Sequence, residues 1–274
     1  MSYRTILVLT DTSTASDDRI ACACRLAGEY GAHLAAIAAS GIYRLVYGSF
    51  DPRGELGDMA PVFADLRARA AARAERFDQL ARQAGLASFA HRIVDDEPGY
   101  ALATGAIYAD LAIVCQTDPD QLDTTSRGIP EYAALHAPCP VLVLPYAGRC
   151  RADFRRVLVA WNASPESARA VRQALPFLTR AADVEVAIIG GGLDAAALGG
   201  RELAVFLARH GIKASLWQSP APDAGEALLS RAAEIDADML VMGCYGHTRL
   251  REVILGGASR TVLRSMTLPV LMAH

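Results

Sequence analysis

Ten short apolar runs recur along the chain, and segments with helical periodicity separate them. These runs are continuous rather than alternating in polarity, which is typical of parallel strands buried on both faces. Strands that alternate with helices predict a doubly wound, Rossmann-like α/β sheet. We expect strands near residues 4–10, 33–39, 88–94, 110–115, 140–145, 156–161, 183–189, 213–218, 238–243 and 269–273.

The order of these elements repeats halfway along the chain. Ile6–Ser13 and Val157–Ser164 each contain an apolar run, then Asp or Asn, a small residue and Ser. Asx and Ser side chains commonly cap helices, and a helical stretch rich in Ala and Arg follows each segment. Asp110–Cys115 likewise matches Asp238–Gly243. An internal repeat of this kind predicts two tandem copies of one five-stranded domain.

We expect these domains over residues 1–147 and 154–274. The first domain carries an inserted segment, 40–61, with several aromatic residues among glycines and prolines. A stretch of this length either covers a ligand or partner or packs over its own domain, and the sequence leaves both open. A long helix should follow over about 62–84 and end at Gly85.

Composition excludes several classes of function. A net charge of −3 argues against nucleic acid as the partner, and no apolar run approaches the roughly 18 residues that span a membrane. Met1–Arg4 leads directly into an apolar run, so we expect no signal peptide and a cytoplasmic protein. Cys22 and Cys24 lie two residues apart in a helical stretch and point in different directions, so we expect no metal site.

Phosphate chemistry of the Walker type is also excluded. Of the 27 basic residues only Lys213 is a lysine, and it lies in a helix-to-strand turn. A Walker loop needs its lysine directly after the loop glycine. With no obvious acid pair or Ser-His-Asp arrangement either, we expect slow or no nucleotide hydrolysis and assign no catalytic residue.

Two strand ends of the second domain carry candidate binding residues. Ligands of open parallel sheets bind beyond the carboxyl ends of strands, where the winding direction reverses. Gly243 and Gly246 let the backbone approach a ligand closely, and a helix that opens at Gly256 would present free amide groups to an anion. The spacing alone also fits simple tight turns. The candidate nucleotide-binding residues are Ala160, Asn162, Met242, Gly243, Tyr245, Gly246, Gly256, Gly257, Ala258 and Ser259.

The glycine spacing resembles a known family. Gly243-x2-Gly246-x9-Gly256 is similar to the nucleotide-binding motif G-x2-G-x9-G-[ST] of the universal stress protein family. The strand ends with Asp or Asn, a small residue and Ser, and the closing Pro-Val-Leu strands, also resemble that family. Because the resemblance covers both halves, the chain looks like a tandem universal stress protein.

The resemblance implies more than the residues themselves show. It implies strand order 3-2-1-4-5 in each domain, a role in stress response, and ATP or AMP, with or without Mg²⁺, in the C-terminal domain. It also implies that residues 140–145 pair with 269–273 in an intrachain pseudo-dimer, and it allows a homodimer of whole chains.

Two departures from the family pattern weaken the nucleotide site. Gly257 stands where the motif has Ser or Thr, and Asn162 stands where nucleotide-binding members usually have Asp. Each lost interaction would cost about 1 kcal/mol. The first domain keeps the acid, Asp11, but lacks the glycine loop. Cys115–Asp120 replaces that loop, and its proline removes an amide donor while its two aspartates would repel phosphate.

These departures keep other hypotheses open. The second hypothesis is a non-nucleotide signalling or interaction module of the same fold, which acts through protein partners or another small ligand. The third is an enzyme of another class that shares the same sheet, although no second catalytic motif is present.

Overall fold

The computed structural model describes most of the 274-residue chain. The described residues are 2–11, 13, 16–42, 59–120, 128–147, 152–190, 193–244 and 257–274, with the backbone alone at 193–198. Most of the inserted segment and of the interdomain linker lies outside them, as does the whole loop 245–256.

The chain divides into two compact units. The N-terminal unit comprises residues 3–133 and 137–139, and the C-terminal unit comprises 140–274 together with residues 1–2 and 134–136. The fifth strand of the first sequence repeat, β5 (Val141–Leu144), therefore lies in the C-terminal unit. The domain boundary drawn between 147 and 154 stays a prediction.

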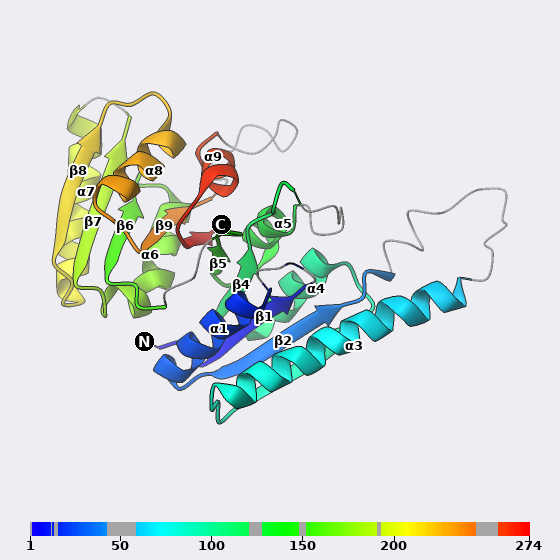
Figure 1. Cartoon of the computed structure of the whole chain (residues 1–274). Coiled ribbons are helices and arrows are strands. Elements are labelled where there is room, and N and C mark those ends of the chain that lie inside the picture. The colour runs from blue at the N-terminus through cyan, green and yellow to red at the C-terminus, as the bar shows by residue number, and fades with distance from the viewer. Residues whose placement is uncertain are drawn as a thin grey trace, which may run out of the picture. The chain divides into compact units, whose positions relative to one another are not determined.

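Four parallel strands form the sheet of the N-terminal unit, in the order β3-β2-β1-β4 (Figure 1). The elements up to the start of the second repeat are β1 (Thr5–Thr10), α1 (Ser16–Tyr30), β2 (His33–Ala39), α3 (Ala60–Gln83), β3 (Phe89–Val94), α4 (Pro98–Gly105), η1 (Ala106–Tyr108), β4 (Leu111–Cys115) and α5 (Ile129–His136). Helix α3 ends as expected, because Gly85 has a φ of 70° and its amide donates to the carbonyl of Arg82.

Five parallel strands in the order β8-β7-β6-β9-β10 form the sheet of the C-terminal unit. Strand β5 joins it antiparallel to β10, with Val143 opposite Val270, which confirms the expected pairing of 140–145 with 269–273. The elements are β6 (Arg156–Ala160), α6 (Pro165–Leu178), β7 (Asp183–Ile189), α7 (Leu193–Arg209), β8 (Ala214–Ser219), α8 (Ala224–Glu234), β9 (Met239–Gly243), α9 (Gly257–Ser265) and β10 (Val270–Ala273).

Both halves of the sequence follow the strand order 3-2-1-4-5, as β3-β2-β1-β4-β5 and β8-β7-β6-β9-β10. Right-handed crossovers place helices on one face of a sheet while the chain moves in one direction, and on the other face after it reverses. Accordingly α1 packs against α3 in the first half, and α8 packs against α9 in the second. The doubly wound, Rossmann-like α/β class is confirmed, and all ten expected strands lie within one residue of their expected ends.

The two edge strands correct one expectation. The central strands are buried on both faces, but β3 and β8 alternate between half-buried and exposed positions. Their sequences, FAHRIV and ASLWQS, already carry polar residues at intervals. The expectation of burial on both faces was wrong for these strands, because each has a partner on one side only and its helix cover is incomplete.

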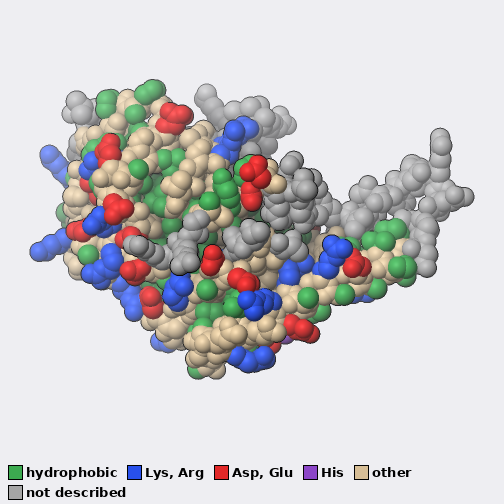
Figure 2. Space-filling model, viewed as in Figure 1, with side chains coloured by type: hydrophobic (Ala, Val, Ile, Leu, Met, Phe, Trp, Pro, Cys, Tyr) green, Lys and Arg blue, Asp and Glu red, His purple; other side chains and the backbone are tan. Residues whose placement is uncertain are grey.

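Charges of both signs are interspersed on the face shown in Figure 2. Helix α3 illustrates the local reason, because several of its arginines pair with nearby carboxylates: Arg69 with Asp65, Arg76 with Asp17 and Arg82 with Asp78.

Candidate functional site

The candidate residues of the C-terminal unit lie at the carboxyl edge of its sheet. Strand β6 pairs with β7 on one side and with β9 on the other, so the winding direction reverses between β6 and β9. The register places Val159 beside Val241, and therefore Ala160 near Met242. The structure thus brings Ala160 and Asn162, at the end of β6, close to Met242 and Gly243, at the end of β9.

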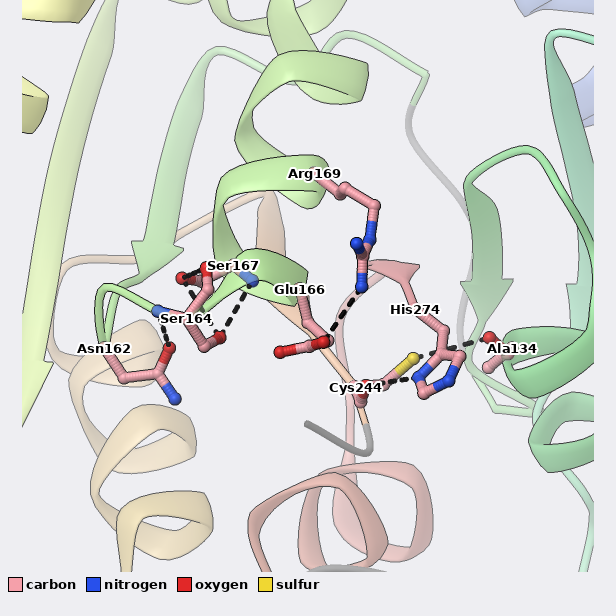
Figure 3. A network of polar contacts seen from close by, with 8 residues as sticks. All are labelled: Ala134, Asn162, Ser164, Glu166, Ser167, Arg169, Cys244 and His274. Atoms are coloured by element: carbon pink, nitrogen blue, oxygen red, sulfur yellow. Dashed lines mark hydrogen bonds and ion pairs between the residues drawn. The ribbon is translucent and has the colours of Figure 1, made fainter. Parts of the chain in front are cut away.

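Asn162 forms a tight turn directly after β6. Its Oδ1 atom accepts a hydrogen bond of 3.2 Å from the backbone amide of Ser164, and Ala163 between them has a left-handed φ of 57°. An amide oxygen has two lone pairs, so one acceptor position of Asn162 is left beside its NH₂ group. Asn162 is exposed, so both groups can face a ligand (Figure 3).

Helix α6 begins at this turn and points its N-terminus towards the same edge. Ser164 caps the helix, because its Oγ atom accepts from the amide of Ser167 at 3.2 Å, and Pro165 occupies the first turn. The positive end of the helix dipole therefore lies beside Asn162. Sequence reasoning identified the capping pattern but did not connect it to the strand that carries the glycines.

Gly243 makes that connection. A Cβ atom added to Gly243 would lie 2.5 Å from the amide nitrogen of Ser167 and 2.6 Å from the carbonyl carbon of Glu166. Real Cβ atoms do not approach backbone so closely. The close approach that the sequence suggested for a ligand is therefore made by helix α6, and Gly243 brings the end of β9 against the helix N-terminus.

A small polar network lies on the other side of this helix start (Figure 3). Glu166 accepts a 2.9 Å hydrogen bond from Arg169 through Oε1, whereas its buried Oε2 atom has no hydrogen-bond partner among the described residues. The thiol of Cys244 donates to the carbonyl of Ala134, and Nδ1 of His274 lies 3.0 Å from the carbonyl oxygen of Cys244. Sequence reasoning missed this network, because its members are distant in the chain.

Cys244 is not a nucleophile in this setting. Burial raises the pKa of its thiol to about 12, and the nearby Glu166 carboxylate adds to the rise against the smaller, opposite effect of Arg169. A thiol with such a pKa stays protonated near neutral pH. The network therefore packs and orients the end of β9 rather than supplying a reactive group.

Helix α9 supplies the remaining described candidates. Gly257 is exposed with open space around its missing side chain, Ala258 is half-buried, and Ser259 is 5% exposed. Gly225 of α8 fixes this end of the helix, because a Cβ there would lie 2.6 Å from Thr261 and 3.0 Å from the carbonyl oxygen of Ala258. Three further candidates lie outside the described residues: Tyr245, Gly246 and Gly256.

The first half contains the counterpart of the Asn162 turn. Oδ1 of Asp11 accepts a 2.9 Å hydrogen bond from the amide of Ser13, as Asn162 does from Ser164. Beyond β4, Asp118 turns back on its own chain and accepts from the amide of Asp120 at 2.9 Å. Residues 121–127 of that loop lie outside the described part of the chain.

The described residues lack two further kinds of feature. They contain no cluster of three or more His, Cys, Asp or Glu side chains that could hold a metal ion. Among their helices none is both long and apolar enough to cross a membrane.

Comparison with known proteins shows which family and which structures the chain is similar to. Residues 195–274 match the model of the universal stress protein family, while no curated protein matches the chain. A universal stress protein from Archaeoglobus fulgidus DSM 4304 has a similar structure, with a TM-score of 0.76 at 18% identity, over 98% of this chain and 95% of that one. A putative universal stress protein from Pseudomonas aeruginosa UCBPP-PA14 gives a TM-score of 0.62 at 18% identity, over 99% and 93% of the two chains.

The fold and the comparisons together define a two-domain α/β protein whose residues 195–274 match the universal stress protein family and whose fold is that of its structural neighbours. The family match lies in the C-terminal half and takes in β9, the candidate loop and α9. The resemblance to a tandem universal stress protein, first suggested by the glycine spacing, is confirmed.

Proposed function

We propose that the C-terminal half binds an adenine nucleotide, ATP or AMP, beyond the carboxyl ends of β6 and β9, with slow or no hydrolysis. The observation that carries the proposal is the exposed Asn162 turn beside the capped N-terminus of α6. Asn162 offers an oxygen and an NH₂ group to a base, as the family resemblance implies for this position.

The phosphate part of the proposal depends on the glycine motif. The spacing of Gly243, Gly246 and Gly256 matches that of the family, and α9 begins directly after it, at Gly257. A helix start without bulky side chains can offer its free amide groups to phosphate oxygens. Mg²⁺, if it accompanies the nucleotide, would be held mainly by the phosphates.

One observation favours the alternative, a module that takes another small ligand or a protein partner. The Glu166 side chain is 13% exposed and lies next to Gly243, and within the described part of the chain one of its oxygens has no hydrogen-bond partner. Arg169 offsets part of the Glu166 charge, so the carboxylate disfavours a polyphosphate only modestly, through direct repulsion. It favours a ligand of lower negative charge, and among the nucleotides AMP over ATP.

Isothermal titration of the purified full chain with ATP and with AMP tests the proposal, together with mass analysis of any ligand that co-purifies. We expect saturable binding that Gly246→Asp abolishes, because a carboxylate in the glycine loop repels phosphate. Restoring the family residues, Asn162→Asp and Gly257→Ser, should each tighten binding several-fold.

Two results would contradict the proposal. One is the absence of heat and of any thermal shift at millimolar nucleotide in both the wild type and the double variant Asn162→Asp/Gly257→Ser. The other is binding that Gly246→Asp leaves unchanged, which would remove the glycine loop from the site.

A further inference from the structure

The two halves use the same turn in opposite ways. Asp11 and Asn162 each follow the first strand of their half and each accept a hydrogen bond from the backbone amide two residues on. Asn162 is exposed. Asp11 is only 17% exposed at its side chain, because a residue of the next helix covers it.

That residue is Arg19 of α1. Its Nη1 atom donates to Oδ2 of Asp11 at 2.8 Å, and its Nη2 atom donates to Oδ1 at 2.7 Å. Nη2 also reaches the hydroxyl of Ser13 at 3.0 Å. The Arg19 side chain is 1% exposed, so the two residues form a buried, bidentate ion pair.

The contacts of Asp11 engage both oxygens of its carboxylate. Oδ1 accepts from the amide of Ser13 at 2.9 Å, from the hydroxyl of Ser13 at 2.6 Å and from Arg19, while Oδ2 accepts from Arg19. Each carboxylate oxygen has two lone pairs, so Oδ1 is fully engaged, whereas Oδ2 keeps one acceptor position that lies under the cover of Arg19. Burial by itself would raise the pKa of Asp11, but the Arg19 charge and these hydrogen bonds hold that pKa below its usual value.

The second half has no arginine at this position. Alignment of the two turns places Ala170 of α6 opposite Arg19, since each lies eight residues after its Asx residue. Both are buried, as are the next matched residues, Ile20 and Val171. The matched helix positions are thus buried in both halves, and the guanidinium of Arg19 is one difference between the two turns.

We propose that Arg19 closes the Asp11 turn of the first half to ligand from within, and that an arginine at the matching position of the second half, where Ala170 stands, would close the Asn162 turn. The statement about the second half rests on the proposed nucleotide function. The statement about the first half rests on the described contacts of Asp11 alone. The chain consequently binds one nucleotide rather than two.

Introducing the Asp–Arg pair at positions 162 and 170 tests the proposal in the second half, where nucleotide binding is proposed. Asn162→Asp alone should keep or strengthen nucleotide binding, whereas Asn162→Asp with Ala170→Arg installs the same ion pair and should weaken it at least tenfold by calorimetry. Wild type should bind with a stoichiometry of one. A double variant that unfolds as cooperatively as the wild type yet binds like Asn162→Asp would overturn the proposal, as would a stoichiometry of two.

A second measurement needs no nucleotide and still decides the matter if the transplanted arginine prevents folding. Asp11→Asn, Arg19→Met and the double variant form a cycle whose unfolding equilibria are measured in urea. We expect Asp11→Asn to lower the free energy of unfolding more than the double variant does, because the single variant leaves the buried Arg19 cation without its carboxylate. The interaction should amount to about tenfold in the unfolding constant, or about 1.4 kcal/mol.

Additive effects in this cycle would show that Arg19 does not hold Asp11, and would overturn the closure of the first half. A wild type that binds no nucleotide, combined with strong coupling in the cycle, would instead overturn the proposed function and support the closure.

Discussion

At the scale of single residues, Gly243 and Gly257 have different roles although both belong to the glycine pattern. Gly243 lies where any side chain would collide with the backbone of Glu166 and Ser167. Gly257 has open space around it at the start of α9. The first glycine is thus required by packing, and the second is open to substitution.

We therefore expect opposite results from two alanine substitutions. Gly243→Ala should lower the free energy of unfolding by about 1–3 kcal/mol, because α6 must shift to make room. Gly257→Ala should leave it unchanged or raise it by up to about 1 kcal/mol, since Ala is a better helix former than Gly. Urea unfolding of both variants checks this, and equal effects would contradict the packing role of Gly243.

At the scale of elements, the N-terminus of α6 links the Asn162 turn to the end of β9. Ser164 caps this helix, and Asp223 caps α8 in the same way, by accepting from the amide three residues on, at 3.2 and 3.0 Å. The two caps are alike as stabilising contacts. Only the first lies at the proposed site.

The two caps provide a matched pair of variants. Ser164→Ala and Asp223→Ala should each cost about 1 kcal/mol of stability. Only Ser164→Ala should also weaken nucleotide binding several-fold, because it loosens the helix start beside Asn162. Thermal unfolding and calorimetry on both variants give the result. Equal losses of affinity would mean that general destabilisation, rather than the helix start, controls binding.

At the scale of the whole molecule, the sequence repeat and the spatial contacts assign β5 to different halves of the chain. It ends the first repeat in sequence, yet it pairs antiparallel with β10 within the C-terminal unit. The two strands are almost fully buried, including Leu142, Val270, Leu271 and Met272. Without β5, the edge of β10 would lose its hydrogen-bond partner.

A comparison of two fragments tests this assignment. Residues 134–274 contain β5, which covers the edge of β10, and should unfold cooperatively. Residues 152–274 lack it, and we expect a lower Tm and self-association through the open edge of β10, measured by light scattering after size exclusion. Equal Tm values and two monomers would contradict the assignment of β5 to this unit. A homodimer of the full chain stays a prediction that the same light-scattering measurement tests.

The sequence by itself determined the fold class, the duplication and all ten strands to within one residue, because continuous apolar runs and helix caps are local signals. It also indicated the family through the spacing of Gly243, Gly246 and Gly256. Its expectation failed at β3 and β8, whose burial depends on their place at the sheet edges.

Only the tertiary structure decided which groups meet. Arg19 reads as an ordinary helical arginine, and its pairing with Asp11 depends on how α1 packs on the end of β1. Gly243 likewise reads as a loop glycine, and its contact with α6 depends on strand order, which brings β9 beside β6. The pattern of residues sets the elements through short-range geometry. Their neighbours in space depend on contacts between segments tens of residues apart, which no local pattern encodes.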